Sequence, residues 1–321
     1  MSYIAWIRGL VGKHRIFLAF TSVVLLNKEG GILLQRRTDF DAWGLPGGVL
    51  EPGEDLLSCA RRELFEESGL TAGELSLVGV YAGPEYESTY PNGDQVQQYT
   101  ICFQSNFGGG KMQVDGIESS EQRFFEPQDI PYDELLPWYQ DMVRDALRGG
   151  EPAFASPFSR QDSYDQIADV RRFIGHELYI GVGAMAVTRD DEGRILMGRR
   201  TDNQQWFFPG GYMFHGENVA YNAVRETLEE TGIEVSPERI LGVYTRTAPY
   251  LCPNGDKVQP VITIFLAHPV GGLLKEDGDE TSEVAWMSLQ EVGQLQVQPS
   301  LKFLRDAILG HLEDGHFIAA S

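Results

Sequence analysis

Apolar and polar residues follow each other along the chain in a pattern that predicts the same series of elements twice. Apolar runs bounded by Gly, Asn and Pro predict strands, and apolar stripes at helical spacing predict helices. In the first half the predicted elements are a short amphipathic helix, strands at 20–27 and 32–36, a helix at 55–68, strands at 75–81 and 97–103 joined across an Asn-Gly turn, and a closing helix at 137–147. Strands interleaved with helices indicate an α/β fold in which helices cover a mixed sheet.

The second half repeats the motifs of the first at one fixed spacing along the chain. The spacing is one residue shorter at the last of the motifs. The repeated motifs are Arg-Arg-Thr-Asp at 36–39 and 199–202, Pro-Gly-Gly at 46–48 and 209–211, Arg-Glu-x-x-Glu-Glu at 62–67 and 225–230, and Pro-Asn-Gly-Asp at 91–94 and 253–256. The first strand and the closing helix of the second copy are therefore expected at 183–190 and 299–312. Self-similarity at this period indicates the duplication of a whole domain.

The duplication sets the predicted domain boundaries. We expect one domain at 1–150 and a second at 166–321, because each half is long enough for an ordinary domain. The stretch at 151–165 is rich in Gly, Pro, Ser and Ala, and we expect it to be an exposed linker. The apolar start of the chain is interrupted by Lys13, His14 and Arg15, and it recurs in mid-chain, so it predicts neither a signal peptide nor a membrane span.

Composition narrows the classes of partner. The formal net charge is −21, a field that disfavours nucleic acid and anionic membranes but attracts divalent cations. The three cysteines, Cys59, Cys102 and Cys252, show neither pairing nor metal-ligand spacing, so we expect reduced thiols in a cytoplasmic protein.

The candidate chemistry is carried by acidic residues on the predicted helix at 55–68. Glu63, Glu66 and Glu67 stand at positions i, i+3 and i+4, so their carboxylates share one face. Like charges at this spacing repel each other, and oxygen-only ligands favour Mg²⁺ or Mn²⁺ as the cations that neutralise them. Arg62 at i−4 from Glu66 is expected to hold that carboxylate in place, and Leu57, Ala60 and Leu64 are expected to face the core.

This constellation resembles the signature of the Nudix (MutT-like) hydrolase family, and the resemblance covers both halves of the chain. It implies a tandem protein with two α/β/α sandwich domains, each with a mixed sheet and a catalytic loop and helix. It also implies Mg²⁺-dependent hydrolysis of the pyrophosphate bond in a nucleoside diphosphate linked to another group, with Mn²⁺ as a substitute and ADP-ribose or nucleotide sugars favoured as substrates. The implied catalytic residues are Arg62, Glu63, Glu66 and Glu67, and Arg225, Glu226, Glu229 and Glu230. The implied metal ligands are the six glutamates of these two sets, the carbonyl oxygens of Gly47 and Gly210, and the later carboxylates Glu118 and Glu280, which are equally well explained as surface acids. One aliphatic position departs from the pattern, where Thr227 replaces Leu64.

Candidate substrate-binding residues surround the two motifs. One arginine of each Arg-Arg pair could bind phosphate in a bidentate manner, and strand alternation turns its neighbour to the other face. Each tryptophan before Pro-Gly-Gly could stack on a base or belong to the core, and one tyrosine after each motif could contact the nucleoside. The residues concerned are Arg36, Arg37, Trp43 and Tyr86 in the first copy, and Arg199, Arg200, Trp206 and Tyr250 in the second.

Three functional alternatives remain open at this point. Both copies could work independently, in which case inactivating either one leaves about half of the activity. Alternatively, only one copy could be catalytically active, and the other copy could form a pseudo-dimer with it. This arrangement is analogous to a homodimer. The chain could also be a nucleotide sensor without catalysis, although a pure binder has no need for two complete sets of acids.

Overall fold

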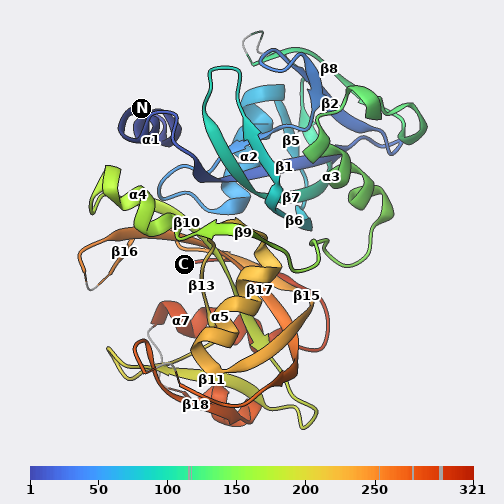
Figure 1. The fold of residues 1–321 in the computed structure, drawn as a ribbon. Coiled ribbons are helices and arrows are strands. Elements are labelled where there is room, and N and C mark those ends of the chain that lie inside the picture. Colours follow the sequence, from blue (N-terminus) through green and yellow to red (C-terminus); the bar gives the residue numbers. More distant parts are fainter. Residues whose placement is uncertain (115, 117, 253, 277, 296–298) are drawn as a thin grey trace. The chain divides into compact units, whose positions relative to one another are not determined.

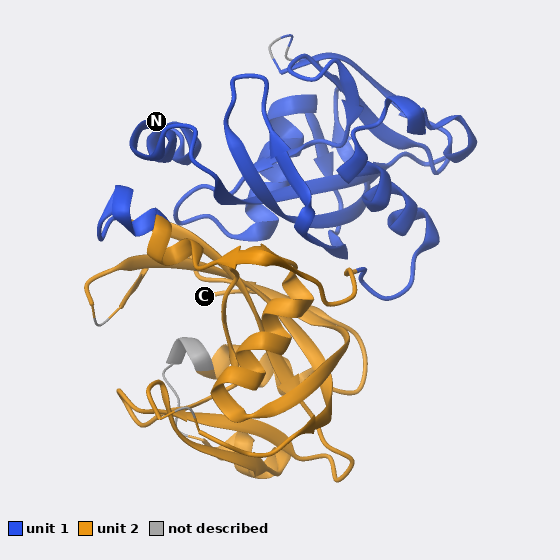
Figure 2. Cartoon of the chain, viewed as in Figure 1, with its two compact units in different colours: residues 1–153, 170–177 blue, residues 154–169, 178–321 orange. Residues whose placement is uncertain are grey.

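In a computed structural model of the chain, residues 1–114, 116, 118–252, 254–276, 278–295 and 299–321 are described. The chain divides into two compact units, unit 1 with residues 1–153 and 170–177, and unit 2 with residues 154–169 and 178–321 (Figure 2). Within the predicted linker, Ala153 forms a bridge with Gly79 of unit 1, and β9 (Ser159–Tyr164) pairs with β14 (His215–Glu217) of unit 2. The repeated Pro253 lies outside the described residues.

Unit 1 is built on a mixed sheet (Figure 1). Its elements are α1 (Tyr3–Val11), β1 (Ile16–Leu26), β2 (Ile32–Arg37), β3 (Ala42–Gly44), β4 (Gly47–Val49), α2 (Leu56–Ser68), β5 (Leu70–Ala72), β6 (Ser76–Thr89), β7 (Gln95–Gly110), β8 (Ser119–Phe125), the 3₁₀ turns Pro127–Asp129 and Tyr132–Glu134, and α3 (Pro137–Arg148). The strand order is β3-β2-β1-β7-β5, with β4 on β1, β6 on β7 and β8 on β2. The central pair β1 and β7 is parallel, whereas its neighbours are antiparallel, which confirms the predicted mixed sheet.

The two faces of this sheet are covered by different helices. Alternate side chains of a strand point to opposite faces, and β1 shows the consequence. The hydroxyl of Thr21 donates to Cys59 Sγ of α2 (3.2 Å), whereas Val24 lies in a core that includes Met142 and Val143 of α3. Helix α3 therefore covers the face to which even-numbered residues of β1 point, and α2 covers the other.

Unit 2 repeats the main elements in the same order. Its elements are β9 (Ser159–Tyr164), α4 (Gln166–Ile174), which crosses the division between the units, β10 (Tyr179–Thr188), β11 (Ile195–Arg200), β12 (Trp206–Phe207), β13 (Gly210–Tyr212), β14 (His215–Glu217), α5 (Val219–Thr231), β15 (Ile233–Thr245), β16 (Tyr250–Leu251), β17 (Lys257–Gly272), β18 (Thr281–Met287), α6 (Leu289–Gln294), α7 (Pro299–Gly310) and β19 (Phe317–Ala320). Relative to unit 1 it adds the short strands β9, β14, β16 and β19, and its strands β12, β11 and β18 form a sheet of their own. The order β13-β10-β17-β15-β19 again has a parallel central pair. Strand β19 pairs with Gly242, the counterpart of Gly79, at which Ala153 forms its bridge in unit 1.

Local sequence signals predict the ends of helix α2 accurately. The side chain of Asp55 caps α2 by accepting from Ser58 N (2.9 Å), and Gly69 ends the helix in the left-handed conformation, with φ 70°. The apolar face differs from the prediction at three positions. Leu57 is only half-buried, and Leu56 and Cys59 join Ala60 and Leu64 in the core.

Strand lengths depart more from the sequence pattern than helix bounds do. Strand β1 begins four residues before the predicted start because residues 16–19 already pair with β7. Strands β6 and β7 extend well beyond the predicted segments and meet at the Asn-Gly turn, where Gly93 N donates to Tyr90 O (2.7 Å). Pairing with a neighbouring strand stabilises polar positions that have no apolar periodicity of their own.

Candidate active site

The Pro-Gly-Gly loop lies directly against the edge of β1 in unit 1. Strand β4 pairs with β1 so that Gly47 faces Ser22 and Gly48 faces Thr21. A Cβ on Gly47 would lie 2.1 Å from the carbonyl oxygen of Thr21, and a Cβ on Gly48 would lie 2.3 Å from Glu63 Cδ. Glycine is therefore required twice: once for close backbone approach and once to admit a carboxylate of α2.

Glu67 anchors the helix to this loop. Its Oε2 accepts from Gly47 N (2.8 Å) and from Gln35 Nε2 (2.9 Å), and the residue is only 4% exposed. Gln122 Nε2 donates to the main-chain oxygen of the same residue (2.6 Å). The loop, the helix and two strands are thus connected through one buried acid.

Arg62 organises the remaining carboxylates. Its Nε and Nη2 donate to the two oxygens of Glu54 (2.8 Å each), and its Nη1 donates to Glu63 (2.7 Å) and Glu66 (3.1 Å). Its Nη2 also lies 3.2 Å from the carbonyl oxygen of Val49. The predicted pairing of Arg62 with Glu66 is present, and Arg62 also fixes the isolated acid of the loop and the first acid of the helix.

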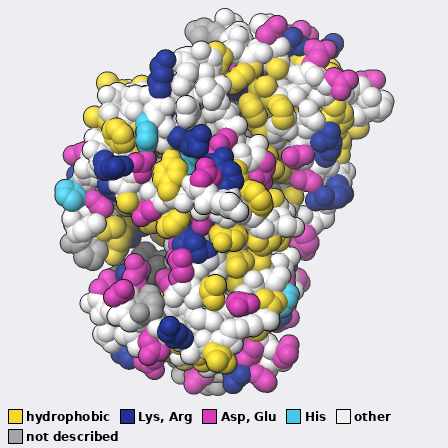
Figure 3. All heavy atoms as spheres, in the orientation of Figure 1, with side chains coloured by type: hydrophobic (Ala, Val, Ile, Leu, Met, Phe, Trp, Pro, Cys, Tyr) yellow, Lys and Arg dark blue, Asp and Glu magenta, His cyan; other side chains and the backbone are white. Residues whose placement is uncertain are grey.

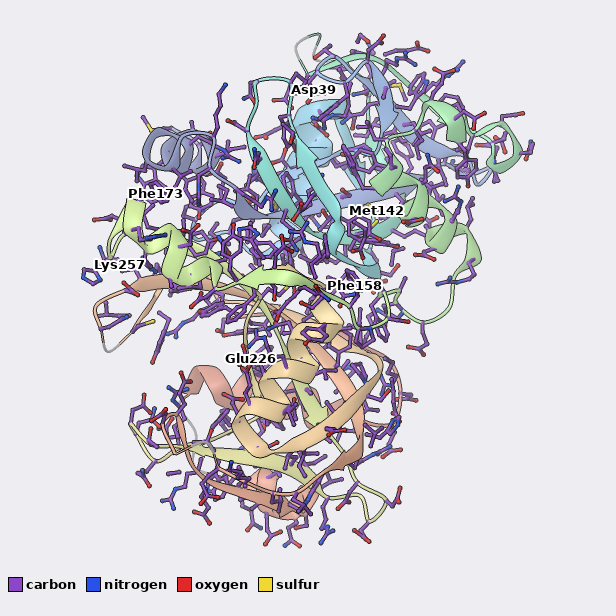
Figure 4. The ribbon with its side chains drawn as sticks, viewed as in Figure 1. Asp39, Met142, Phe158, Phe173, Glu226 and Lys257 are labelled. Atoms are coloured by element: carbon purple, nitrogen blue, oxygen red, sulfur yellow. The ribbon has the colours of Figure 1, made fainter. Side chains whose placement is uncertain are left out.

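Unit 2 repeats this arrangement with small differences. Glu230 accepts from Gly210 N (2.9 Å), and Arg225 pairs with Glu217 (2.6 Å), Glu226 (2.9 Å) and Glu229 (2.9 Å). Glu226 projects from α5, as Figure 4 labels it. Both units therefore hold the same set of carboxylates around an arginine.

Burial raises the pKa of four of these carboxyl groups, those of Glu63, Glu67, Glu226 and Glu230. Burial raises the pKa of Glu67 to about 8 and that of Glu226 to about 7, and it raises the pKa of Glu63 as well. The pKa of Glu230 rises to about 9 through burial and, next, the charge of Glu226. Carboxyl groups held in this way gain most from a cation that neutralises them, because such a cation restores their ionised form.

We expect Glu67→Gln to stabilise the metal-free protein at high pH. The folded-state pKa of about 8 lies above the ordinary value of 4.5, so the stability that this carboxyl contributes is full below pH 4.5 and is lost as the pH rises through 8. The variant should therefore gain about 4 kcal/mol in free energy of unfolding at pH 8.5 and almost nothing at pH 4.5. Urea unfolding in EDTA measures this, with the exposed Glu66→Gln as control. An equal change at both pH values would contradict the expectation.

A cavity of about 520 Å³ opens next to the acids of unit 1. Three groups of residues are among those that line it: Gly47, Gly48, Arg62, Glu63, Glu66 and Glu118 of the loop, the helix and the later segment; Thr21, Ser22, Gln98 and Thr100 of the central strands; and Arg37, Phe40, Tyr90, Trp138 and Tyr139. This volume suits a small-molecule ligand. Negative and positive groups and an aromatic wall thus share one cavity.

The predicted arginines divide as strand alternation requires. Arg37 lines the cavity and pairs with Asp39 (2.7 Å), whereas Arg36 pairs outside it with Asp41 and Glu134. In unit 2 the corresponding pairs are Arg200 with Asp202 (3.0 Å) and Arg199 with Glu283 (3.1 Å).

The aromatic residues singled out in the sequence lie elsewhere. Trp43 is 4% exposed and packs edge-on against Phe125 in the core, and Tyr86 is buried in the same core with its hydroxyl 3.4 Å from Asp141. Trp206 packs against the core of unit 2, and Tyr250 lies exposed on β16 beside Arg246. Trp43 and Tyr86 are not among the residues that line the described cavity of unit 1.

Sequence reasoning missed the aromatic wall of the cavity. Phe40 lies 5.5 Å from Tyr90 and 5.7 Å from Trp138, measured between ring centroids. The three residues come from the loop after β2, from the turn between β6 and β7, and from the start of α3. Their spacing carries no periodic signal; the only hint was the position of Phe40 directly after the repeated Arg-Arg-Thr-Asp motif.

The later carboxylates lie near the predicted ligands. Glu118 lines the cavity of unit 1, and its charge raises the pKa of Glu63, although burial is the larger cause. Glu280 acts in the same direction on Glu230. Within the described part of the chain, no three acidic, His or Cys side chains converge tightly enough to form a ready metal-binding group. Arg62 and Arg225 instead hold the acids around their guanidinium groups.

Three further features of the chain bear on the predictions made from composition: its helices, its surface charge and its cysteines. In the described residues, no helix combines the length and the apolar character that crossing a bilayer needs. Acidic side chains are spread over the visible face rather than gathered in one patch (Figure 3). Cys59 and Cys102 are buried thiols without a disulfide.

Comparison with known proteins identifies the class. The family model of the NUDIX domain matches residues 18–146 and 180–307, so the chain belongs to this family and is a tandem Nudix hydrolase. It is 33% identical over 129 residues to a putative 8-oxo-dGTP diphosphatase of Bacillus subtilis, a match that covers 40% of this chain and 79% of that protein. It is 30% identical over 141 residues to an ADP-ribose pyrophosphatase of Methanocaldococcus jannaschii, covering 42% and 78%. A crystal structure of a NUDIX hydrolase from Nitrosomonas europaea matches with a TM-score of 0.36 and 24% identity, covering 44% of this chain and 78% of that one.

Proposed function

We propose that the chain hydrolyses the pyrophosphate bond of a nucleoside diphosphate linked to another group, in a reaction that depends on Mg²⁺. The observation that carries this proposal is the cavity of unit 1, which is lined by Glu63, Glu66 and Arg37 together and whose volume suits a small-molecule ligand. ADP-ribose and nucleotide sugars are the favoured substrates. Relatives named for 8-oxo-dGTP, ADP-ribose and RNA pyrophosphohydrolysis support the bond type.

The residues present suit a hard divalent cation. Glu63, Glu66, Glu67 and the carbonyl oxygen of Gly47 would hold it, with Glu118 as a further carboxylate, and all of these ligands are oxygens. When bound, the ion neutralises phosphate oxygens and acidifies a water. The fit rests on the missing Cβ of Gly48, which admits the Glu63 carboxylate, and on the buried acid Glu67, whose ionised form burial disfavours and a cation would restore.

The protein's own groups supply positioning and proton transfer. Arg62 holds the carboxylates of Glu54, Glu63 and Glu66 in a fixed spatial arrangement. The acids therefore need little rearrangement during the reaction. Arg37 lines the same cavity, and its planar guanidinium suits bidentate binding of phosphate. Glu66 is the exposed acid of the set and is our candidate for the general base, with Glu118 as the alternative.

The proposal is tested with a substrate panel. ADP-ribose, sugar nucleotides, dinucleoside polyphosphates and nucleoside triphosphates are incubated with the intact chain, and products are scored by phosphate release after phosphatase treatment. We expect cleavage of a pyrophosphate bond in at least one nucleoside diphosphate derivative, its loss in EDTA, and its recovery with Mg²⁺ or Mn²⁺. Binding of these compounds by the folded protein without any cleavage would favour the sensor alternative and contradict the proposal.

A further inference from the structure

Helix α1 lies outside the part of the chain that the family model matches, yet it recurs in the duplication. The model begins at residues 18 and 180, after α1 and after its counterpart α4. Arg8 of α1 and Arg171 of α4 each donate to two carbonyl oxygens just beyond their own helix, at distances between 2.6 and 3.1 Å. Both copies therefore carry the same helix, closed at its end by an arginine.

Arg8 also reaches the hairpin between β6 and β7. Its Nη2 donates to the carbonyl oxygen of Gln95 (2.9 Å), and its Nε lies 3.4 Å from Asp94 Oδ2. The side chains of the ion pair are only 10% and 20% exposed, so solvent screens it less than it screens a surface pair. Arg8 therefore fastens the hairpin to the end of α1.

The hairpin carries one of the residues that line the cavity of unit 1, Tyr90. Its turn is closed by bonds from Tyr90 N to Asp94 O (2.9 Å) and from Gly93 N to Tyr90 O (2.7 Å). Burial raises the pKa of the Tyr90 hydroxyl to about 12, and the positive charges of Arg37 and Arg8 counteract part of that rise. The phenol thus lies within electrostatic reach of both arginines, and the bonds that fix the hairpin to Arg8 also fix Tyr90.

The other end of α1 is attached to the loop that leads to the acids. Tyr3 N donates to both carboxylate oxygens of Glu51, at 3.1 and 2.9 Å. Glu51 N in turn donates to Glu54 Oε2 (3.2 Å), and Arg62 holds the same carboxylate by two bonds. The residues on both sides of Tyr3 also line the cavity. Helix α1 therefore connects the hairpin with the loop that carries the isolated acid.

The bond from the helix to a loop carboxylate is a feature of unit 1. In unit 2, Phe214 takes the place of Glu51, because its N donates to Glu217 Oε2 (3.0 Å) as Glu51 N does to Glu54. The ring of Phe214 lies over the guanidinium of Arg225, 4.0 Å from it. A ring cannot accept the bond that Glu51 accepts from the start of α1.

We propose that Arg8 is a positioning residue for the cavity of unit 1. Through its bonds to the hairpin, and with α1 attached to the loop at Glu51, Arg8 keeps Tyr90 and the loop in the arrangement that receives a ligand. A wall that is ordered before binding raises affinity, because its ordering no longer opposes binding. This inference rests on the proposed function only for the identity of the ligand as a nucleoside diphosphate derivative.

Hydrogen exchange measured by mass spectrometry tests the hairpin and the ligand together. The intact chain is titrated in Mg²⁺ with α,β-methylene-ADP, a nucleoside diphosphate whose bridging carbon resists hydrolysis, and exchange is followed in residues 88–97. This segment reports on unit 1 whatever unit 2 binds. We expect Arg8→Gln to speed exchange of the ligand-free hairpin about tenfold, and to raise the probe concentration that gives half-maximal protection about fivefold.

Two sets of variants serve as controls. Arg61→Gln is matched to Arg8→Gln, because Arg61 also joins a helix of unit 1 to carbonyl oxygens, those of Ala72 (2.8 Å) and Gly73 (2.7 Å), and it should leave the hairpin unchanged. Asp94→Asn should weaken the probe as well, and its combination with Arg8→Gln should weaken the probe no more than Arg8→Gln alone, because the two side chains act as a pair. Arg8→Lys keeps the charge next to Asp94 and should recover part of the affinity.

Several results would overturn the positioning role of Arg8. They are equal exchange of the hairpin with and without Arg8→Gln, an unchanged half-protecting concentration, the same effects in Arg61→Gln, and a probe that leaves the hairpin of the unmutated chain unprotected. Exchange in β8 is the internal reference: faster exchange there too would mean a general loss of stability and would also contradict the proposal. Failure of the proposed function gives a different result, in which the probe protects the hairpin in an Arg8-dependent manner but the substrate panel shows no cleavage.

Discussion

Replacing Glu66 and Glu229 together by Gln is expected to reduce pyrophosphate-bond hydrolysis at least about thousandfold, because each unit then lacks one acid of its ligand set and its candidate base. Each carboxylate pairs with its arginine at the same spacing, Glu66 with Arg62 (3.1 Å) and Glu229 with Arg225 (2.9 Å). Gln keeps the size of the side chain and one acceptor oxygen but removes the charge. The fold should therefore persist, which circular dichroism and thermal unfolding check.

The single variants measure how much of the hydrolytic activity each unit contributes. Matched carboxylates alone predict that each variant keeps about half of the activity. The strand residues beside the two sets of acids differ, because unit 1 has Ser22 and Thr100 where unit 2 has Met185 and Ile262, and this difference predicts an uneven division for a substrate with a base. For such a substrate we expect Glu66→Gln to remove most of the turnover and Glu229→Gln to remove less than half. Initial rates at saturating Mg²⁺ give the ratio.

Two results of these activity measurements would contradict the expectations. Retention of more than about a tenth of the activity in the double variant would place the chemistry on other residues. A complete loss in either single variant, with the protein still folded, would show that the units are not independent. The pyrophosphatase assay is run on the substrate found in the panel, and the same preparations are compared for metal binding, so that loss of the ion and loss of the base are told apart.

The sequence predicted the parts of the site that depend on local geometry. The face shared by Glu63, Glu66 and Glu67, the cap at Asp55 and the left-handed Gly69 follow from helix periodicity and from termination rules that act within a few residues. The duplication strengthened these predictions because the same spacing recurs in α5. The roles of the individual acids in the reaction stay predictions until they are measured.

The cavity could not be predicted in the same way. Its wall combines residues from a loop, a turn and a helix start that are distant in the sequence, and only the paired strands bring Phe40, Tyr90 and Trp138 together. Trp43 was a reasonable candidate for stacking because it precedes the Gly-Gly loop, but strand β3 turns its side chain onto Phe125. Which face a side chain takes depends on the register with neighbouring strands, and a single sequence does not contain that register.

Gly47→Ala is expected to destabilise unit 1 severely. The new Cβ would lie 2.1 Å from the carbonyl oxygen of Thr21 and 2.8 Å from Ser22 Cα, and both are backbone atoms of the central strand that cannot rotate away. Relief requires β4 to leave β1, which also breaks the bond from Gly47 N to Glu67. We expect a loss of about 3 kcal/mol or more in unfolding free energy, together with the activity of unit 1.

The chain offers two matched comparisons for this substitution. Gly210→Ala meets Met185 Cβ at 2.4 Å and Ala184 O at 2.5 Å, so it should destabilise unit 2 to a similar extent. Gly9→Ala in α1 meets nothing within 4 Å and should be neutral or stabilising, because Ala favours a helix more than Gly does. Denaturant unfolding of the three variants compares their free energies of unfolding directly. If Gly47→Ala unfolds at the same denaturant concentration as Gly9→Ala, the close approach of the loop to β1 is wrong, and with it the placement of the carboxylates at the cavity.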